Sequence, residues 1–198
     1  DLYLISVSDD ALNDLAKNSK LKEQINNNLV VHTAGSVHMD VLKPLSKNYG
    51  VFYPLQSFSK FKFVDFKNIP LCLEASSGFI YDKLAKYAIK ISDNVRRINS
   101  DQRKFVHLAA VFANNFTNNL FAVAEKILSD HHIDFDILLP LIQETVEKIK
   151  ENKPSKVQTG PAVRNDLSVL QKQTELLENK ELLKVIYTLL SKNIQEFK

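Results

Sequence analysis

The sequence predicts an α/β domain over residues 1–98 followed by an all-α domain over residues 99–198. In the first part, short apolar runs alternate with helical segments, which is typical of a parallel sheet whose strands are connected by helices. After Ser100 the short runs stop, and apolar residues recur every three or four positions, as they do on one face of a helix. We therefore expect a partial parallel sheet covered by helices, followed by a helical second domain.

The candidate strands of the first part are short and rich in β-branched and aromatic residues. They are Leu2–Val7, Leu29–Thr33, Val51–Tyr53, Phe61–Phe66, Leu71–Glu74 and Asn94–Ile98. The apolar spacing between them predicts a short helix after Ser8-Asp9-Asp10, a helix over Val37–Leu45 and a longer helix over Gly78–Ile91. In such a sheet, ligands bind at the carboxyl ends of the strands.

Four helices are expected in the second part. Ser100 is the expected N-cap of a long apolar helix over Asp101–Ser129, and Asp134–Lys150 forms the next helix. Asn152–Ala162 contains two prolines and a glycine and is the expected loop. Asn165 or Asp166 then caps a helix that runs to about Leu177, and Lys180–Phe197 forms the last helix.

Composition excludes several classes of function. The formal net charge is +3 and no basic stripe is present, so we expect no nucleic-acid partner. No apolar run is long enough to span a membrane. The single cysteine, Cys72, permits no internal disulfide and is typical of a reducing compartment, so a cytoplasmic location is expected. Only four glycines occur, far apart, which excludes a glycine-rich phosphate loop within these residues.

Three stretches together resemble a known family. They are LVVHTAGS at 29–36 with VFYPLQSFSK at 51–60, HLAAVFANNFTNNL at 107–120, and TGPAVRND at 159–166. The combination resembles Rossmann-like, NADP-dependent oxidoreductases with a helical C-terminal domain of unknown function. Their wider relatives are pyrroline-5-carboxylate reductases, 6-phosphogluconate dehydrogenases and β-hydroxyacid dehydrogenases.

The resemblance implies NADP as the cofactor. In this family the first βαβ unit carries the glycine-rich turn and reads the ribose, and Leu2–Val7 resembles the fourth strand of the sheet. About two βα units are therefore expected upstream, since a βαβ unit takes roughly 30 residues or more. Residues 1–98 would then be the C-terminal part of the dinucleotide-binding domain, with an incomplete cofactor site, and 99–198 a helical dimerisation and substrate domain like that of 6-phosphogluconate dehydrogenase.

The ends of the first two strands carry the first candidate site residues. Val7, Ser8, Asp9 and Thr33 are the expected cofactor-binding residues, because the corresponding strand–turn of relatives backs the nicotinamide. The alternative for Ser8 or Asp9 is that it only caps the next helix. Gly35 permits close approach of the backbone to a substrate.

Three further polar side chains lie at the ends of the strands or just after them. Ser36 can cap the next helix and also donate to a substrate oxygen. His32 is a candidate substrate contact, but it lies inside a strand and can instead be a packed, hydrogen-bonded histidine. Gln56 follows the third strand and offers a donor and an acceptor, with a purely structural turn as the alternative.

The long helix carries a second group of candidates. His107, Asn114, Asn115 and Asn118 fall within one broad face of a regular α-helix. Relatives carry a catalytic lysine and an asparagine on this helix, but no lysine lies between Lys104 and Lys126. His107 is then the titratable residue suited to proton transfer. The alternative is that these groups form buried hydrogen bonds between helices.

Arg164 is the remaining candidate, because its guanidinium can hold a substrate carboxylate through two hydrogen bonds. The alternative is an Arg164–Asp166 pair that fixes the loop. The histidines at 131 and 132 are adjacent and point apart on regular structure, so no metal site is expected.

The resulting hypothesis is an oxidoreductase that transfers hydride between NADP and a small carboxylate-bearing substrate. His107 would exchange the proton, Ser36 and Asn115 would orient the reacting atom, and Arg164 would hold the carboxylate. Two alternatives stay open: a non-catalytic dinucleotide- or metabolite-binding regulator on the same fold, and a helical protein-interaction module. The long helix is apolar on more sides than one small monomer can cover, which predicts a homodimer formed through the helical domain.

Overall fold

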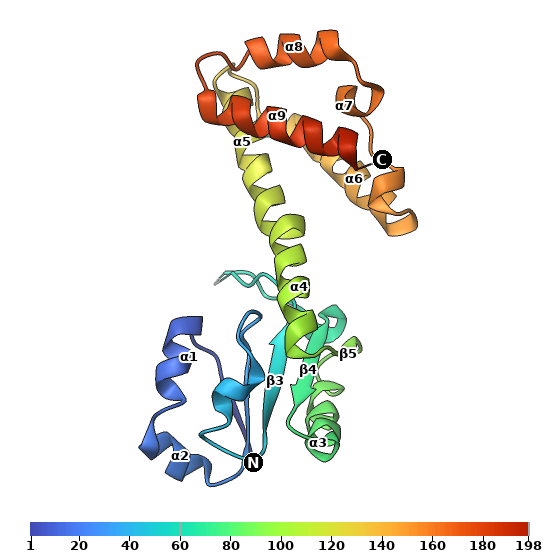
Figure 1. Cartoon of the computed structure of the whole chain (residues 1–198). Helices are drawn as coiled ribbons and strands as arrows, with labels where there is room; N and C mark the ends of the chain where they lie inside the picture. Colours follow the sequence, from blue (N-terminus) through green and yellow to red (C-terminus); the bar gives the residue numbers. More distant parts are fainter. Residues whose placement is uncertain (60, 198) are drawn as a thin grey trace. The chain divides into compact units, whose positions relative to one another are not determined.

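The computed structural model describes residues 1–59 and 61–197, and these divide into two compact units, 1–123 and 124–198. Figure 1 shows the chain with its elements labelled. The boundary expected after residue 98 was based on the change from α/β to helical elements. The two compact units are instead defined by contacts within the structure, so the boundary after residue 98 stays a prediction.

The first unit contains a five-stranded sheet in the order β1-β2-β3-β4-β5. The strands are β1 (Leu2–Ile5), β2 (Leu29–His32), β3 (Tyr49–Pro54), β4 (Leu71–Ala75) and β5 (Val95–Arg97). The pairs β1–β2, β2–β3 and β4–β5 are parallel, whereas β3 and β4 are antiparallel. The sheet is thus mostly parallel, and the expectation of an all-parallel sheet was wrong at one pair. An antiparallel neighbour needs no helical crossover, and the described residues of the β3–β4 connection, 55–59 and 61–70, form no helix longer than the short 3-10 turn η2 (Phe66–Asn68).

Two apolar layers cover the two faces of this sheet. Leu29 and Val31 pack with α3 (Gly78–Ala88), whereas Val30 between them packs with α1 (Asp9–Leu15), α2 (Ser19–Ile25) and the 3-10 turn η1 (Met39–Leu42). Neighbouring side chains of a strand point to opposite faces, so one short buried strand serves both layers. In Figure 1, α1 and α2 lie on one side of the sheet and α3 on the other.

Two expected elements of the first unit differ from the structure. Phe61–Phe66 forms no strand, because Phe61 and Phe63 are 100% and 93% exposed and gain no burial from a sheet. The helix expected over 37–45 is only the turn η1. α2 was not predicted; Asn18 caps it by accepting a hydrogen bond from the Leu21 N–H at 3.0 Å.

The long helix expected over 101–129 is present but interrupted. It consists of α4 (Ser100–Ala110), a π-helical segment, η3 (Val111–Phe116), and α5 (Thr117–Ser129). Its N-cap is Asn99, not Ser100: the Asn99 side chain accepts from the Gln102 N–H, and the Gln102 side chain accepts from the Asn99 N–H. This frees the Ser100 hydroxyl to donate to Glu74 Oε2 at 2.6 Å.

The second unit contains the end of α5 and the helices η4 (Phe135–Leu138), α6 (Leu139–Glu151), η5 (Pro154–Lys156), α7 (Pro161–Arg164), α8 (Leu167–Glu175) and α9 (Glu181–Glu196). α6, α8 and α9 follow the expected positions closely, whereas η5 and the start of α7 lie in the expected loop over Asn152–Ala162. Asp166 is the N-cap of α8, as expected, and accepts from the Val169 N–H at 3.3 Å. In the described part of the chain, no helix is long and apolar enough to cross a membrane.

Candidate active site at the carboxyl ends of the strands

The loop that follows β2 lies directly against β3 and α4. A Cβ atom added to Gly35 would lie 2.7 Å from His107 Nδ1 and 2.9 Å from Tyr53 Cζ, closer than real Cβ contacts. Only glycine fits this position without displacing a ring. At Gly35, the loop after β2 thus lies against Tyr53 of β3 and His107 of α4.

Tyr53 and His107 form the polar centre of this contact. The Tyr53 hydroxyl oxygen lies 3.2 Å from His107 Nδ1, and the two rings meet edge to face with centroids 6.3 Å apart. Burial raises the pKa of the Tyr53 phenol above its ordinary value. At neutral pH the phenol therefore keeps its proton and can donate it in a hydrogen bond.

An open groove with a volume of about 640 Å³ lies beside this pair. Its polar lining is Tyr53, Gln56, Ser57, His107, Asn114 and Asn115, and its apolar lining is Leu55, Val106, Ala109, Ala110, Val111 and Ala113. A concave, largely apolar surface with a few convergent polar groups is the usual form of a small-molecule site. The predicted candidates Gln56, His107, Asn114 and Asn115 thus share one groove.

Asn118 does not line the groove, although a regular helix would place it on the face of His107. The π segment η3 accounts for the difference. A π turn closes its hydrogen bonds five residues apart instead of four, so residues that follow it are rotated about the helix axis. Asn118 is the second residue after this segment. The expected face therefore holds only as far as Asn115.

The residues after β1 and β2 make a second polar contact at the same edge of the sheet. Ser36 donates a hydrogen bond to the Asp9 carboxylate, and the Thr33 hydroxyl donates to Ser6 Oγ at 3.3 Å. Ser8 occupies the N-cap position of α1 but makes no capping hydrogen bond with its side chain. Val7 is exposed. Of the four candidate cofactor residues, Asp9 thus contacts Ser36, which follows Gly35, and Thr33 contacts Ser6.

His32 is completely buried, which favours a packed histidine over a substrate contact. Its Nδ1 accepts a hydrogen bond from the Ala34 N–H at 3.1 Å, and among the described residues its buried Nε2 has no partner. Burial lowers the pKa of His32 to about 4, and the positive charge of Arg103 adds to this effect. The imidazole is therefore neutral at physiological pH.

Arg103 and Glu74 form a buried ion pair that the sequence did not predict. Arg103 Nη1 lies 2.8 Å from Glu74 Oε2, with side-chain exposures of 1% and 13%. Arg103 Nη2 donates to the Val37 carbonyl oxygen, which belongs to the loop that carries Gly35. Arg103 lies one helical turn before His107, so the pair ties this loop and β4 to the helix that bears His107.

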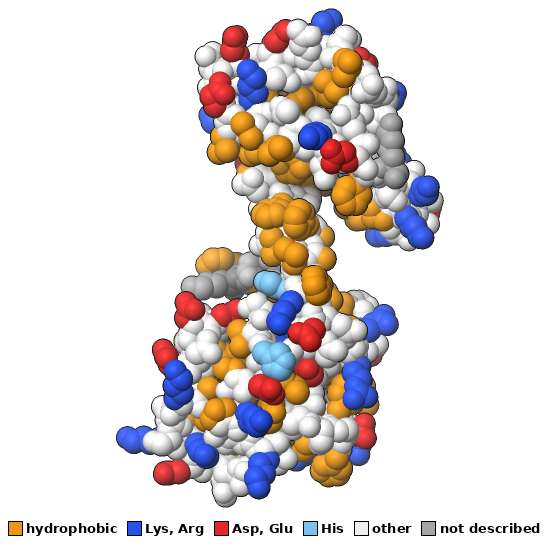
Figure 2. All heavy atoms as spheres, viewed as in Figure 1, with side chains coloured by type: hydrophobic (Ala, Val, Ile, Leu, Met, Phe, Trp, Pro, Cys, Tyr) orange, Lys and Arg blue, Asp and Glu red, His pale blue; other side chains and the backbone are white. Residues whose placement is uncertain are grey.

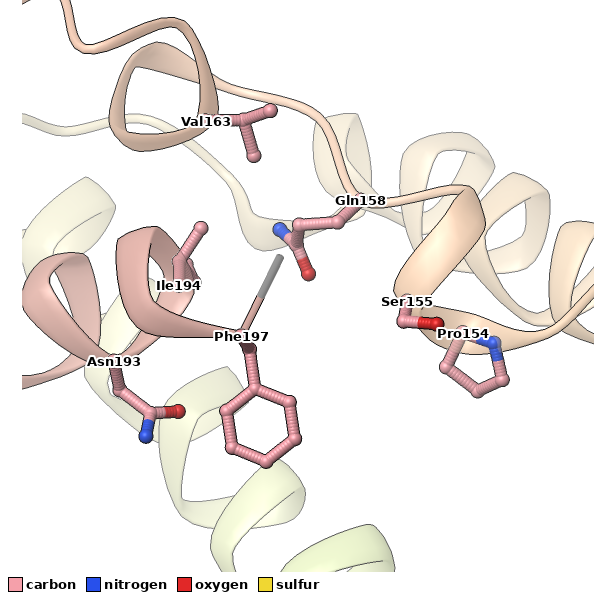
Figure 3. A pocket seen from close by; sticks show the side chains of 7 residues that line it. All are labelled: Pro154, Ser155, Gln158, Val163, Asn193, Ile194 and Phe197. Atoms are coloured by element: carbon pink, nitrogen blue, oxygen red, sulfur yellow. The ribbon is translucent and has the colours of Figure 1, made fainter.

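Arg164 is the last residue of α7, in the second unit. Among the described residues it forms no ion pair with Asp166, whose carboxylate caps α8 instead. The same unit contains a smaller hollow of about 240 Å³, whose labelled residues are seen in Figure 3. Pro154, Ser155, Gln158, Val163, Asn193, Ile194 and Phe197 line it.

No group of three or more His, Cys, Asp or Glu side chains converges as a metal site within residues 1–59 and 61–197. His131 and His132 end the turn after α5, and His132 has a left-handed backbone conformation (φ 58°). Cys72 is buried in β4. These residues therefore lie outside the groove.

The fold and sequence match one family and several solved structures. A family model described as a domain of unknown function, DUF2520, matches residues 69–194. A candidate NADP oxidoreductase from Bacteroides fragilis is 42% identical, with a TM-score of 0.89, and the match covers 98% of this chain and 75% of that one. No curated protein matches the sequence.

Two more distant structures share the fold. A protein from Thermotoga maritima is 24% identical, with a TM-score of 0.76 and coverage of 98% of this chain and 76% of that one. An imine reductase from Myxococcus stipitatus, solved in complex with NADP⁺, is 13% identical, with a TM-score of 0.63 and coverage of 99% and 74%. These neighbours support a Rossmann-like fold of the kind found in oxidoreductases.

Proposed function

The chain belongs to the DUF2520 family, and we propose that it is an NADP-dependent oxidoreductase acting on a small carboxylate-bearing substrate. The carrying observation is the Tyr53–His107 contact beside a groove at the carboxyl edge of the sheet. This edge is where doubly wound sheets bind their ligands. The relative from Bacteroides fragilis, described as a candidate NADP oxidoreductase, supports the cofactor.

The polar residues after β1 and β2 suit the nicotinamide and ribose groups of such a cofactor. Ser8, Thr33 and Ser36 offer hydroxyls, and Asp9 offers a carboxylate, which together can bind amide and ribose hydroxyl groups. When bound, the nicotinamide would supply or accept the hydride. Val7, Ser8, Asp9 and Thr33 would hold these groups of the cofactor next to the Gly35 loop.

The residues of the groove would then handle the proton and the orientation of the substrate. His107 Nδ1 would hold or release the proton, since imidazole exchanges protons near neutral pH. Asn115 and Ser36 would orient the reacting oxygen or nitrogen; the Ser36 oxygen can still accept a hydrogen bond while its proton points to Asp9. Arg164 would hold the carboxylate, as the resemblance of the 159–166 segment implies.

The long helix supports a homodimer through the helical domain. Phe105, Leu108, Phe112 and Phe116 are 73%, 53%, 62% and 50% exposed. Figure 2 shows apolar side chains gathered on this helix. Exposed apolar patches of this kind mark interaction surfaces, and a second copy of the helical domain would cover this one.

Binding and turnover test the proposal separately. We expect the full-length natural protein to bind NADPH, and to oxidise it with pyruvate, 2-oxobutyrate or a five-membered cyclic imine carboxylate as probe. His107→Ala should retain NADPH binding and lose turnover, with His131→Ala as the matched control outside the groove. Absence of NADPH binding by the full-length protein would contradict the proposal.

A non-catalytic regulator is the second candidate. It is favoured by the absence of a lysine among the residues that line the groove, all of which the structure describes. NADPH binding without oxidation across the probe set would support the regulator, because binding and chemistry are then separated.

A further inference from the structure

Tyr53 has no role in the reaction as proposed above, although its hydroxyl occupies the centre of the site. Resting on that proposed function, we infer that Tyr53 is the catalytic residue that delivers the proton to the substrate, and that His107 restores the proton to Tyr53. The sequence placed this role on His107 alone. The geometry divides it between two side chains.

The surroundings of Tyr53 restrict where its hydroxyl can point. Gly35 covers the head of the ring on one side, at a position where an added Cβ would lie 2.9 Å from Cζ. His107 Nδ1 lies 3.2 Å from the hydroxyl oxygen. Tyr53 also lines the groove. The hydroxyl hydrogen can therefore point either to His107 or into the groove.

The protonation state of His107 decides between these two directions. A neutral imidazole with a free Nδ1 accepts the hydrogen bond, and the Tyr53 hydrogen points away from the groove. A protonated imidazole donates from Nδ1 to the phenol oxygen, and the Tyr53 hydrogen turns toward the groove. The pair is ready to reduce a substrate in this second state.

The proton transfer balances in two linked moves. The substrate carbonyl or imine carbon would receive a hydride from a reduced nicotinamide dinucleotide, the donor of the proposed function. The Tyr53 O–H bond breaks and the hydrogen binds the substrate oxygen or nitrogen; the His107 Nδ1–H bond breaks and the phenol O–H forms again. His107 ends neutral and takes its next proton from water.

The charge of Arg103 favours these two proton transfers. Burial raises the pKa of Tyr53, which makes a lasting phenolate unfavourable, while the charge of Arg103 acts in the opposite direction. The phenol is therefore protonated at rest, and the charge of Arg103 offsets part of the cost of a transient phenolate. Arg103 itself is buried against Glu74 and does not line the groove, so it does not replace Tyr53 as the donor.

The test compares Tyr53→Phe with Tyr49→Phe. Tyr49 lies on the same strand, and its hydroxyl donates to Asp40 Oδ1 at 2.8 Å, so both variants lose one tyrosine hydrogen bond. In the full-length protein, Tyr53→Phe should lower kcat by about 10²–10⁴-fold, the usual contribution of a positioned acid, without weakening NADPH binding. Tyr49→Phe should leave kcat within about threefold, a factor worth less than a typical neutral hydrogen bond.

A spectroscopic readout tests the pair without turnover. In ¹⁵N-labelled protein without substrate, Tyr53→Phe should shift the His107 Nδ1 resonance, and Tyr49→Phe should not. If Tyr53→Phe is unstable, 3-fluorotyrosine at position 53 keeps the hydroxyl and makes it a more acidic donor, so it should change kcat without weakening NADPH binding. An unchanged kcat contradicts the donor role.

The failures of the two proposals are distinguishable. A wild-type protein that does not bind or oxidise NADPH overturns the oxidoreductase proposal and the donor role with it. A wild-type protein that turns over while Tyr53→Phe keeps an unchanged kcat overturns only the role of Tyr53. An unchanged Nδ1 resonance in Tyr53→Phe overturns the pairing with His107.

Discussion

Arg103 and Glu74 are 29 residues apart in sequence, yet their side chains meet at 2.8 Å beneath the loop that carries Gly35. Ser100 completes the contact by donating to the same carboxylate oxygen, Glu74 Oε2, at 2.6 Å. A buried ion pair stabilises a fold mainly when both partners are present, because removal of one leaves a buried charge without compensation.

Arg103→Met should therefore lower the free energy of unfolding by about 3–5 kcal/mol, the typical cost of breaking a buried pair. Urea denaturation measures this. Lys67→Met is the matched control: it breaks the Lys67–Asp93 pair, whose side chains are 56% and 74% exposed, and an exposed pair contributes about 1 kcal/mol or less. A similar loss in both variants would contradict the role of burial. The double variant Arg103→Met with Glu74→Leu should recover part of the stability.

Gly35→Ala should lower the free energy of unfolding by about 1–3 kcal/mol, the usual cost of forcing extra atoms into a packed site. The added methyl group would meet His107 Nδ1 at 2.7 Å and displace one of the two rings. Thermal unfolding measures the loss. Gly78→Ala is the control, because an added Cβ there meets nothing within 4 Å, and its melting temperature should not fall.

His32 should make the fold sensitive to mild acid. Its pKa is about 4 in the folded chain and 6.5 in the reference state, so the unfolded chain binds the proton more readily. The stability is fully present above pH 6.5 and decreases as the pH falls toward 4, by on the order of 3 kcal/mol in total. Urea denaturation at several pH values measures the slope. The dependence of the free energy of unfolding on pH should persist in His131→Gln and weaken in His32→Gln. An equal dependence in both variants would show that other titratable groups cause it.

Asp130 should remain ionised to unusually low pH. Its carboxylate accepts hydrogen bonds from Lys126 and, at 2.8 Å, from Lys180, and these contacts lower its pKa to about 2. An NMR titration of the carboxyl carbon should therefore show a midpoint near pH 2. Lys180→Met should raise the midpoint, whereas Lys172→Met on α8 should leave it unchanged. Since Asp130 is exposed, added salt should also raise it.

The fold was largely predictable because apolar periodicity reports burial directly. The strands around Val30 and Leu73 and the helices after residue 99 were located to within a few residues. Phe61–Phe66 misled the prediction, since its residues have strand-forming side chains but stay exposed. α2 was missed because its single buried residue, Ile25, gives no amphipathic pattern.

The candidate site was predictable only in part. Strand ends and a polar helix face pointed to Gly35, Gln56 and His107, and the structure brings Gly35 and His107 into contact. Tyr53 was predicted only as the last residue of a strand, because nothing local to it shows that its hydroxyl meets a helix 54 residues later.

The π segment between α4 and α5 has a consequence for comparing this helix with others. Its wide turn rotates the side chains that follow about the helix axis. The seven-residue spacing of a regular helix therefore places Asn114 correctly on the face of His107, in the groove, but assigns the residues of α5 to the wrong face. An alignment with a regular helix requires a one-residue gap within Val111–Phe116. Without that gap, residues of α5 would be assigned to the wrong face, and Asn118 would be counted among the groove residues.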